Sequence, residues 1–513
     1  MLPSSFPYVV KMKRSSSIGA EARVKAVKKA EDKPAAVDET DSAIGSDLEY
    51  EDDFADEFEH EEIVDAQYED VEVNFDDEEA AAATADKTAN TPAPSVFRPG
   101  IDQLEPGQVL EPEPGTYKML HRLEVQWPCL SFDILPDALG DKRSRFPMTA
   151  YVVSGTQADN AEKNKLIVMK WANLHKTSKD GIDEEDEEEN HRRFRLEEDS
   201  DDSDDENDQE PELEFRMLKH AGGVNRVRAM PQMGSLVASW SDNSSVYVYN
   251  VHAELEALEG RGNPAAGSQK PVHAFSGHST EGFAMGWNPH QVGQLVTGDC
   301  AGGCYMWEPA SGGTWTQSAI LKSAAKSFSS IEDIEFRRAG DNCANIFAIC
   351  GGEAGKVGIV DVRNSAKVAT EFVAHKGDTN VLSWNPIVGQ LLLTGGDDGT
   401  FKVWDVRATS RGALANFKWH REAITSVDWH PVDEAVLAVS SADDTTSIWD
   451  MSVEEDLAAS ADAQGAEYYP PQLLFLHMGQ KSVKEIKFHK QMPGVVVSTA
   501  FDGFNIFKTF NIA

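Results

Sequence analysis

Two groups of residues have the types and the order of a catalytic triad. The groups are His375, Thr394 and Asp398, and His420, Ser441 and Asp443. A hydroxyl, an imidazole and a carboxylate held in line can activate a nucleophile. The second group, however, lies in a segment that aligns without a gap to the segment holding the first. One active site does not recur in successive repeats, so the pattern favours a structural role.

The cysteines offer little further chemistry. There are five, an odd and sparse set, which argues against a disulfide framework and for a reducing compartment. They are Cys129, Cys300, Cys304, Cys343 and Cys350. Cys300 and Cys304 alone make a weak metal motif, and buried thiols on or near strands are the better interpretation. We therefore expect no metal and no cofactor.

The residues of the two triad-like groups belong to internal repeats. "AHKGDTNVLSWNPIVGQLLLTGGDDGTFKVWDVR" begins at Ala374, and "WHREAITSVDWHPVDEAVLAVSSADDTTSIWDMS" begins at Trp419. A third copy begins at Gly277. Each copy carries a histidine, a turn and a closing Trp, and its apolar residues alternate with a period of two. These features are typical of WD repeats, in which four short antiparallel strands form one blade of a β-propeller.

Counting the closing strands predicts how many blades there are. The closing positions are Trp171, Tyr249, Trp307, Val360, Trp404, Trp449 and Phe507. The sequence therefore predicts an all-β fold, a seven-bladed WD-repeat β-propeller over residues 128–513. In such repeats the histidine, the turn aspartate and the closing Trp hydrogen-bond together. The repeat that closes at Trp307 has Ala301 where the aspartate is expected, so we expect its set to be incomplete.

The segment before the propeller is expected to contain a helix. "GTYKMLHRLEVQWPCLSFDIL" (115–135) has apolar residues at Tyr117, Leu120, Leu123 and Trp127, which would share one face of a helix. We expect residues 95–127 to pack on the propeller through this N-terminal helix. Residues 1–94 read as a basic, then acidic, disordered tail.

Most of the net charge of −40 is concentrated in two segments. Residues 38–79 hold 21 acidic and no basic residues, and residues 183–214 hold 19 acidic residues against three arginines. Chains this charged repel themselves and bury too little apolar surface to fold, so both segments are expected to be disordered. The second would lie in a loop (177–214) inserted between blades 1 and 2. A further acidic loop containing Pro-Pro is expected at 452–472.

The acidic segments indicate what the protein binds. Such charge repels nucleic acid and anionic membrane and attracts strongly basic proteins. We expect the partner-binding residues of the acidic loop to be Asp183, Glu184, Glu185, Asp186, Glu187, Glu188, Glu189, Asp201, Asp202, Asp204, Asp205 and Glu206. Single exposed ion pairs contribute only ~0–1 kcal/mol each, so specificity must come from the propeller.

Further motifs give a family resemblance. A helix before a seven-bladed propeller, with an acidic Pro-Pro loop near its end, resembles the retinoblastoma-binding histone-chaperone subgroup of WD proteins. The motifs "WPCLSFDI", "GGVNRVR", "FSGHSTEGFAMGWNP", "LVTGDC", "IEDIEF" and "QLLFLHMGQ" resemble one branch of it, over residues 95–513. That branch is the glutamate-rich WD-repeat family, the dedicated chaperones of the third large-subunit ribosomal protein.

The resemblance implies a role in early assembly of the large (60S) ribosomal subunit, in the nucleus and nucleolus with shuttling through the cytoplasm. The protein would be a monomer without enzymatic activity that escorts the basic ribosomal protein to pre-60S particles, without binding nucleic acid itself. A basic cluster at Lys11, Lys13 and Arg14 would suit nuclear import.

Two surfaces of the propeller are candidates for docking. One is a ring at one mouth of the channel, formed by Trp240, Glu281, Glu332, Asp378, Asn380 and Glu422. The alternative is that these residues only support their own turns. The other is a groove between the helix and the Pro-Pro loop, with Tyr117, Leu120, His121, Glu454, Glu455, Asp456, Pro470 and Pro471. In the histone-binding relatives this groove takes a basic helix; here the helix face could instead seal the propeller.

Two rival functions stay open. Chaperoning of core histones shares the fold and the charge logic. A substrate receptor of a cullin ubiquitin ligase is indicated by "WDVR" (404–407), with Asp405 and Arg407 as docking residues. An enzyme has little support, because no nucleophile motif, phosphate-binding loop or metal cluster stands out.

Overall fold

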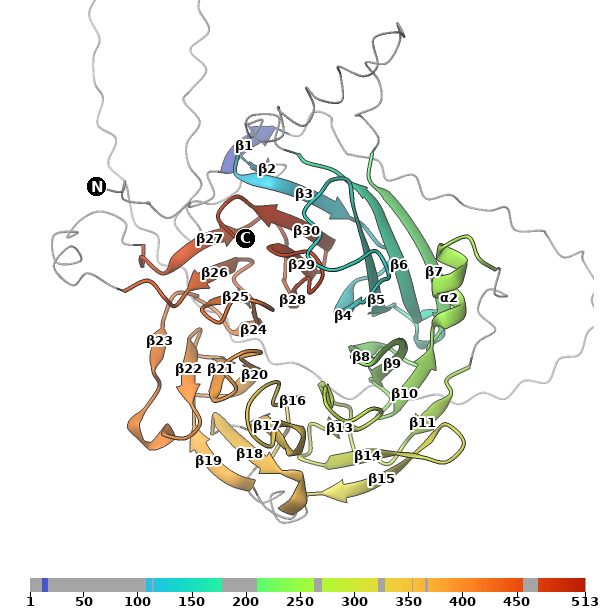
Figure 1. Ribbon diagram of the computed structural model, residues 1–513, viewed down its shortest axis with the longest axis vertical. Coiled ribbons are helices and arrows are strands. Elements are labelled where there is room, and N and C mark those ends of the chain that lie inside the picture. Colours follow the sequence, from blue (N-terminus) through green and yellow to red (C-terminus); the bar gives the residue numbers. More distant parts are fainter. Residues whose placement is uncertain are drawn as a thin grey trace, which may run out of the picture. The chain divides into compact units, whose positions relative to one another are not determined.

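The computed structural model describes residues 12–16, 108–112, 115–177, 210–262, 270–321, 328–352, 354–364, 368–454 and 469–512. Seven four-stranded antiparallel sheets surround a central channel as the blades of a propeller (Figure 1). The seven closing positions predicted from the sequence all lie on the third strand of a blade, so the expected fold is confirmed.

Each blade runs from an inner strand at the channel to an outer strand at the rim. Blade 1 has β4 (Cys129–Leu135), β5 (Met148–Thr156), β6 (Lys165–Leu174) and β7 (Glu212–Lys219). Blade 2 has β8 (Val224–Met230), β9 (Met233–Ser241), β10 (Val246–Asn250) and β11 (His273–Phe275). Blade 3 has β12 (Ala284–Trp287), β13 (Leu295–Gly298), β14 (Cys304–Ala310) and β15 (Thr314–Ile320). Blade 4 has β16 (Asp333–Phe336), β17 (Ile346–Gly351), β18 (Lys356–Asp361) and β19 (Val368–Val373).

The remaining blades follow the same order. Blade 5 has β20 (Thr379–Trp384), β21 (Leu391–Gly396), β22 (Phe401–Asp405) and β23 (Ala415–Phe417). Blade 6 has β24 (Ile424–Trp429), β25 (Val436–Ser441), β26 (Thr446–Asp450) and β27 (Leu473–His477). Blade 7 has β28 (Glu485–Phe488), β29 (Val495–Ala500), β30 (Gly503–Thr509) and, as its outer strand, β3 (Tyr117–Leu123).

Strand β3 closes the ring and corrects the expectation of a helix over 115–127. Its buried residues alternate with a period of two, and β3 pairs antiparallel with β30, with Leu120 opposite Phe507. The Tyr117 hydroxyl lies 2.7 Å from His477 Nδ1 in blade 6. The period-two face buries Tyr117, Met119 and Leu123, and the helical spacing of apolar residues was coincidental. An outer strand from the N-terminal side therefore joins the two ends of the propeller.

Outside the blades, two short strands, one α-helix and several 3-10 turns complete the described elements. β1 (Met12–Ser16) pairs antiparallel with β2 (Gln108–Pro112), and the helix α2 (His252–Leu258) follows β10. The 3-10 turns are η1 (Ala161–Lys163), η3 (Cys343–Asn345), η4 (Val362–Asn364) and η5 (Thr409–Arg411). No helix in the described part of the chain is long and apolar enough to cross a membrane.

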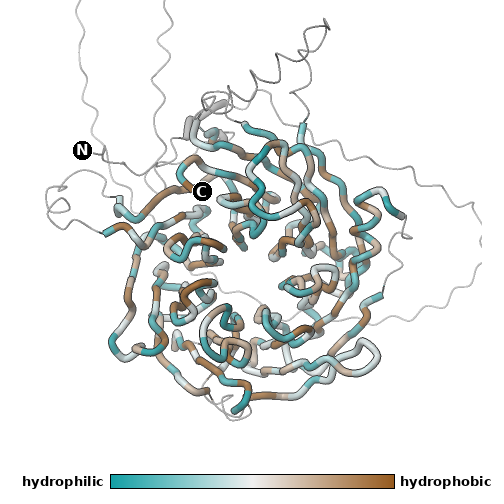
Figure 2. Tube along the Cα trace, in the orientation of Figure 1, coloured by the Kyte–Doolittle hydropathy of each residue, from teal (hydrophilic) through white to brown (hydrophobic). Residues whose placement is uncertain are grey.

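The core lies between and within the blades. Apolar and polar residues alternate along the strands (Figure 2), and the apolar ones pack against the next blade. The largest fully buried side chains include Trp171, Trp240, Trp307, Trp384, Trp429 and Trp449. Each such aromatic side chain removes a large apolar area from water, which stabilises the blade-to-blade packing.

The predicted acidic loop corrects one boundary. Its described ends are Thr177, after β6, and Glu210, before β7, and both strands belong to blade 1. The insertion therefore joins two strands of one blade and does not connect blades 1 and 2. The acidic residues assigned to it, 183–189 and 201–206, lie outside the described residues, as does the acidic tail.

Candidate partner-binding surface at the propeller mouth

The triad-like residues tie their own blades together. In blade 5, Trp404 Nε1 donates to Thr394 Oγ1 at 3.0 Å, and this hydroxyl lies 2.8 Å from His375 Nε2. His375 Nδ1 lies 3.1 Å from Asp398 Oδ1. A carboxylate only accepts, so Nδ1 donates to Asp398 and Nε2 accepts from Thr394. Every group in this chain of hydrogen bonds is satisfied within the blade.

The electrostatics agree with a structural role. Burial lowers the pKa of His375 to about 4 against the opposing effect of Asp398, so the imidazole is neutral near pH 7. Burial opposes ionisation of Asp398, but hydrogen bonds from Thr400 and the Lys376 amide lower its pKa to about 2. His375 is only 3% exposed, which leaves a substrate no access to the imidazole. The sequence preference for structure over catalysis agrees with this geometry.

Two details of these ties differ from expectation. In blade 6 the hydroxyl between His420 and Trp449 comes from Ser447, because His420 Nε2 lies 2.8 Å from Ser447 Oγ. In blade 3 the set is complete, although it was expected to lack its aspartate. Asp299, two residues earlier than Ala301, lies 3.0 Å from His278 Nδ1. The bond depends on the shape of the turn and not on a fixed count to the Trp.

The predicted ring residues other than Trp240 do lie at one mouth of the channel. In every blade the connection into the inner strand and the turn between the second and third strands come together at the same face, because successive strands are antiparallel. We call this face the mouth. Glu281, Glu332, Asp378 and Glu422 lie in the connections into blades 3, 4, 5 and 6. Glu281 and Glu422 are exposed, and Glu332 and Asp378 are partly exposed.

Mouth turns add two acids that sequence reasoning missed. Asp242 and Asp397 are exposed in the second-to-third-strand turns of blades 2 and 5. The Asp397 N–H donates to the Asp378 carbonyl at 3.0 Å, which places turn and connection side by side. These aspartates directly follow β9 and β21. A rule that searched the turn after each second strand would have found them.

Four of the mouth acids lack cationic partners among the described residues. Glu281 Oε2 accepts from Asn225 Nδ2 at 3.0 Å, and Asp397 Oδ1 accepts from Asn380 Nδ2 at 2.8 Å. These are neutral amides. No Lys or Arg of the described ranges makes an ion pair with Glu281, Glu332, Asp397 or Glu422. Several carboxylates on one face without counter-charges create a negative potential that attracts cations.

Two ring residues have other roles than the one expected. Trp240 is fully buried and is not a docking residue, because its Nε1 donates to the Ala284 carbonyl at 3.0 Å and its ring packs against His278. Its place in "SWSDN" is the end of β9, where the side chain points between blades 2 and 3. Asn380 orients Asp397 and also donates to the Ile424 carbonyl at 3.3 Å, which ties blade 5 to blade 6.

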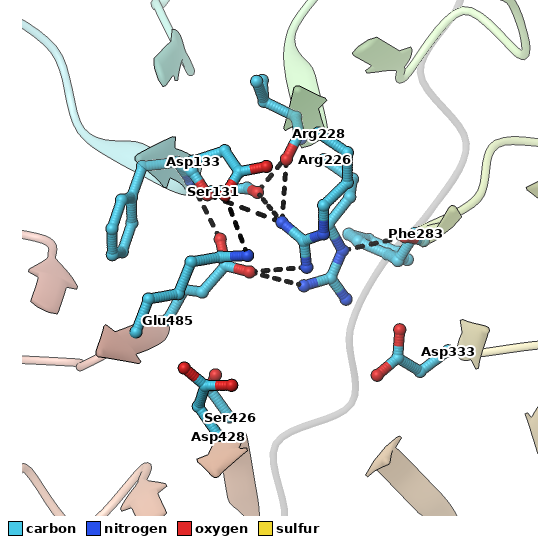
Figure 3. Close-up of polar contacts among 12 residues, drawn as sticks. Ser131, Asp133, Arg226, Arg228, Phe283, Asp333, Ser426, Asp428 and Glu485 are labelled. Atoms are coloured by element: carbon cyan, nitrogen blue, oxygen red, sulfur yellow. Dashed lines mark hydrogen bonds and ion pairs between the residues drawn. The ribbon is translucent and has the colours of Figure 1, made fainter. Parts of the chain in front are cut away.

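Below the mouth, the channel wall carries an ion network that the sequence did not reveal. Glu485 of blade 7 pairs with Arg228 at 2.6 Å and with Arg226 at 3.3 Å, both from blade 2 (Figure 3). Lys487 pairs with Asp133 of blade 1 at 3.2 Å. Burial would raise the pKa of Glu485, but Arg228, Lys487 and Arg226 outweigh it and lower this pKa to about 2.

The network continues round the channel. Arg338 pairs with Glu335 of blade 4 and, at 3.7 Å, with Asp428 of blade 6. Asp428 Oδ2 in turn accepts from the Phe488 amide at 2.9 Å. Here each of these carboxylates has a guanidinium or a backbone N–H beside it. The channel charges are therefore committed to joining blades, in contrast to the mouth charges.

The predicted helix-and-loop groove is not supported. Tyr117 and His121 are buried on β3, and His121 Nε2 lies 2.9 Å from the His175 carbonyl. The Leu120 N–H donates to Thr177 Oγ1 at 3.0 Å. Strand β3 is thus occupied by blade 7 and by residues 175–177, and it offers no helix face. Pro470 and Pro471 are partly buried before β27, Glu454 is exposed, and Glu455 and Asp456 lie outside the described residues.

The ligase-type motif is partly occupied by its own residues. Arg407 makes a two-pronged pair with Asp405, with Nη2 to Oδ2 at 2.6 Å. Arg363 and Asp361 in blade 4 form the same pair. The geometry therefore follows from an Asp-Val-Arg turn that occurs twice in this propeller, and it does not mark one blade as special.

Comparison with known proteins identifies the relatives of the chain. A family model described as that of the histone-binding protein RBBP4 and its counterpart in the CAF1 complex matches residues 107–175. A model of the WD domain, G-beta repeat, matches residues 366–405 and 412–450. The first match spans β3 and most of blade 1, and the second spans most of blades 5 and 6.

Three relatives match most of the chain. Protein HEAT STRESS TOLERANT DWD 1 of Arabidopsis thaliana is 40% identical over 436 residues, covering 81% of this chain and 92% of the relative. Glutamate-rich WD repeat-containing protein 1 of Dictyostelium discoideum is 41% identical over 463 residues, covering 89% and 93%. Ribosome assembly protein rrb1 of Schizosaccharomyces pombe is 36% identical over 488 residues, covering 92% and 94%. Similarity of this extent shows that the chain belongs to the glutamate-rich WD-repeat protein family.

Proposed function

We propose that the protein is a non-enzymatic chaperone that escorts a basic large-subunit ribosomal protein during early ribosome assembly in the nucleus and nucleolus. The observation that carries the proposal is the mouth, where Glu281, Glu332 and Glu422 lie on one face without a cation from the described part of the chain. The relative named ribosome assembly protein rrb1, similar over almost its whole length, supports the process.

The mechanism follows from charge. Free ribosomal proteins carry many Lys and Arg side chains that otherwise stick to any polyanion. Carboxylates at the mouth take the place of RNA phosphates and neutralise a part of those cations. The acidic segments 38–79 and 183–206 add a second, less specific anionic shield. At the assembly site the denser charge of RNA displaces both, and the client is transferred.

The client we propose is the third large-subunit ribosomal protein. Its capture is tested by competition on the pure full-length protein at physiological salt. The ribosomal protein and a core histone H3–H4 complex are offered together, and the bound fraction of each is measured. A matched variant lacks residues 183–206, which ends before β7 begins at Glu212 and leaves blade 1 intact.

The expected result is preferential retention of the ribosomal protein by the full-length protein. Its retention should fall without residues 183–206 but persist, since the mouth is unchanged. Equal retention of both ligands, or loss of all binding in the deletion variant, would contradict the proposal. Binding would then depend on bulk charge alone.

A histone client is the second candidate, and the match of residues 107–175 to the histone-binding family model favours it. The structure weakens one part of this alternative. The helix that would frame a groove for a histone helix is replaced by strand β3 over residues 117–123. A win for the H3–H4 complex in the same competition would establish this candidate in place of the first.

A further inference from the structure

The mouth has one aromatic residue where other blades have polar or small ones. In six blades, the residue after the second strand donates its backbone N–H to the carbonyl of the connection into that blade. The donors are Gln157, Asp242, Cys300, Asp397, Ala442 and Phe501, at 2.9 to 3.1 Å. Because the same bond fixes each of them, the six positions are equivalent around the mouth. Blade 7 presents Phe501 at this position.

Phe501 is unusually exposed for its size. Among the large apolar side chains of the described residues it has the greatest exposed fraction, 66%. Its backbone is fixed, since its N–H donates to the Lys481 carbonyl at 2.9 Å and the Lys481 N–H donates to Asp502 Oδ1 at 3.2 Å. A fixed, exposed aromatic ring contributes nothing to the core, and such rings are frequent anchors in protein interfaces.

Hydrogen bonds connect Phe501 to the end of the acidic arc. Ser441 Oγ donates to the Glu422 carbonyl at 3.0 Å, at the start of the blade 6 turn. At the other end of that turn, Asp444 Oδ1 accepts from the Ser482 N–H, one residue after Lys481. The sequence of neighbours is therefore Glu422, the blade 6 turn, then Phe501. A single extended segment of a client can cross all three.

We propose that the mouth recognises a basic client segment that carries a large apolar side chain beside its Lys or Arg residues, with Phe501 as the apolar contact and Glu332, Asp397 and Glu422 as the cationic contacts. The inference rests on the proposed function and adds a specificity-determining residue to it. Charge alone would accept any polycation, whereas an apolar contact at one end of the arc selects among basic proteins and fixes the direction of the bound segment.

The test separates the two contacts by their response to salt. Affinity of the full-length protein for the third large-subunit ribosomal protein is measured by titration at physiological and at high salt. The variants are Phe501→Ala, Phe501→Leu and Glu422→Gln. Phe510→Ala is the matched control, because Phe510 is also exposed, at 47%, but follows the far end of β30. Strand β30 spans seven residues, so the two rings are ~20 Å apart along it.

The expected result is about tenfold weaker binding by Phe501→Ala at both salt concentrations, because an apolar contact is not screened. Phe501→Leu should retain most of the affinity, and Phe510→Ala should match the wild type. The effect of Glu422→Gln should shrink at high salt. Unchanged affinity of Phe501→Ala, or a loss that disappears at high salt, would overturn the inference while the proposed function stands. Failure of the wild-type protein to bind the client would refute the proposed function itself.

Discussion

Carboxylates in two regions of this propeller have opposite surroundings. In the channel, Glu485 is 3% exposed at its side chain and contacts Arg226 and Arg228 from the neighbouring end of the ring. At the mouth, Glu281 and Glu422 are exposed and contact no cation of the described chain. The difference teaches that channel charges are used to hold the blades together. The mouth charges contribute no such bond, and their cations must come from a partner.

The buried network gives the largest expected effect on stability. Glu485→Ala leaves Arg226 and Arg228 in the channel without their carboxylate, and it removes the acceptor of the Phe132 N–H. Breaking one partner of a buried pair costs about 3–5 kcal/mol. We expect a lower urea midpoint for this variant and almost none of that loss for Glu422→Ala. Equal midpoints of the two variants would remove the distinction between channel and mouth.

Acid should weaken the propeller through its buried histidines. Burial lowers the pKa of His375 and of His220 to about 4, so the unfolded chain binds their protons more readily than the folded chain does. Their contribution to stability is present above about pH 6.5 and is lost as the pH falls toward 4. Urea midpoints measured from pH 7.5 to 5 should fall.

The variant His375→Gln sharpens this prediction. It should be less stable at pH 7.5, because the bond to Asp398 is changed, but its midpoint should fall less between pH 7.5 and 5. The mouth variant Glu422→Gln should show the same decline as the wild type. A decline that is as steep in His375→Gln would show that other groups dominate.

The smallest effect is expected for neutralising the mouth. The variant Glu281→Gln, Glu332→Gln, Asp378→Asn and Glu422→Gln keeps side-chain size, and Gln can still accept from Asn225. Exposed charges of one sign repel each other, so the free energy of unfolding should stay within about 0.5 kcal/mol of the wild type or rise slightly. A marked loss of stability would mean that these acids support their own turns.

The sequence predicted local features of the fold better than distant ones. Each repeat reports its own strands through the period-two pattern and its closing Trp, so the seven blades could be counted. The assignment of 117–123 to a helix was wrong, because the partner of β3 is β30, near the opposite end of the chain. Local spacing cannot show that a strand will be needed to close a ring.

The site was predictable to the same degree. Glu281, Glu332, Asp378 and Glu422 follow from their positions after the repeat landmarks, and they do lie at the mouth. Trp240 was misplaced, since a tryptophan at a strand end can point into the core or outward. The channel network requires Glu485 and Arg228 from two blades that meet only in the folded ring. No spacing in the sequence brings those two residues together.

The most direct test of the account compares two sets of four acids. The mouth variant described above is titrated with the third large-subunit ribosomal protein at physiological salt. Its control changes Asp141→Asn, Asp341→Asn, Asp433→Asn and Glu434→Gln, four exposed acids in the turns between first and second strands on the opposite face. Both variants change the net charge equally. We predict about tenfold weaker binding for the mouth variant alone, since each lost pair costs ~0.2–1 kcal/mol. Equal weakening of both variants would contradict a specific surface and leave only the attraction of net charge.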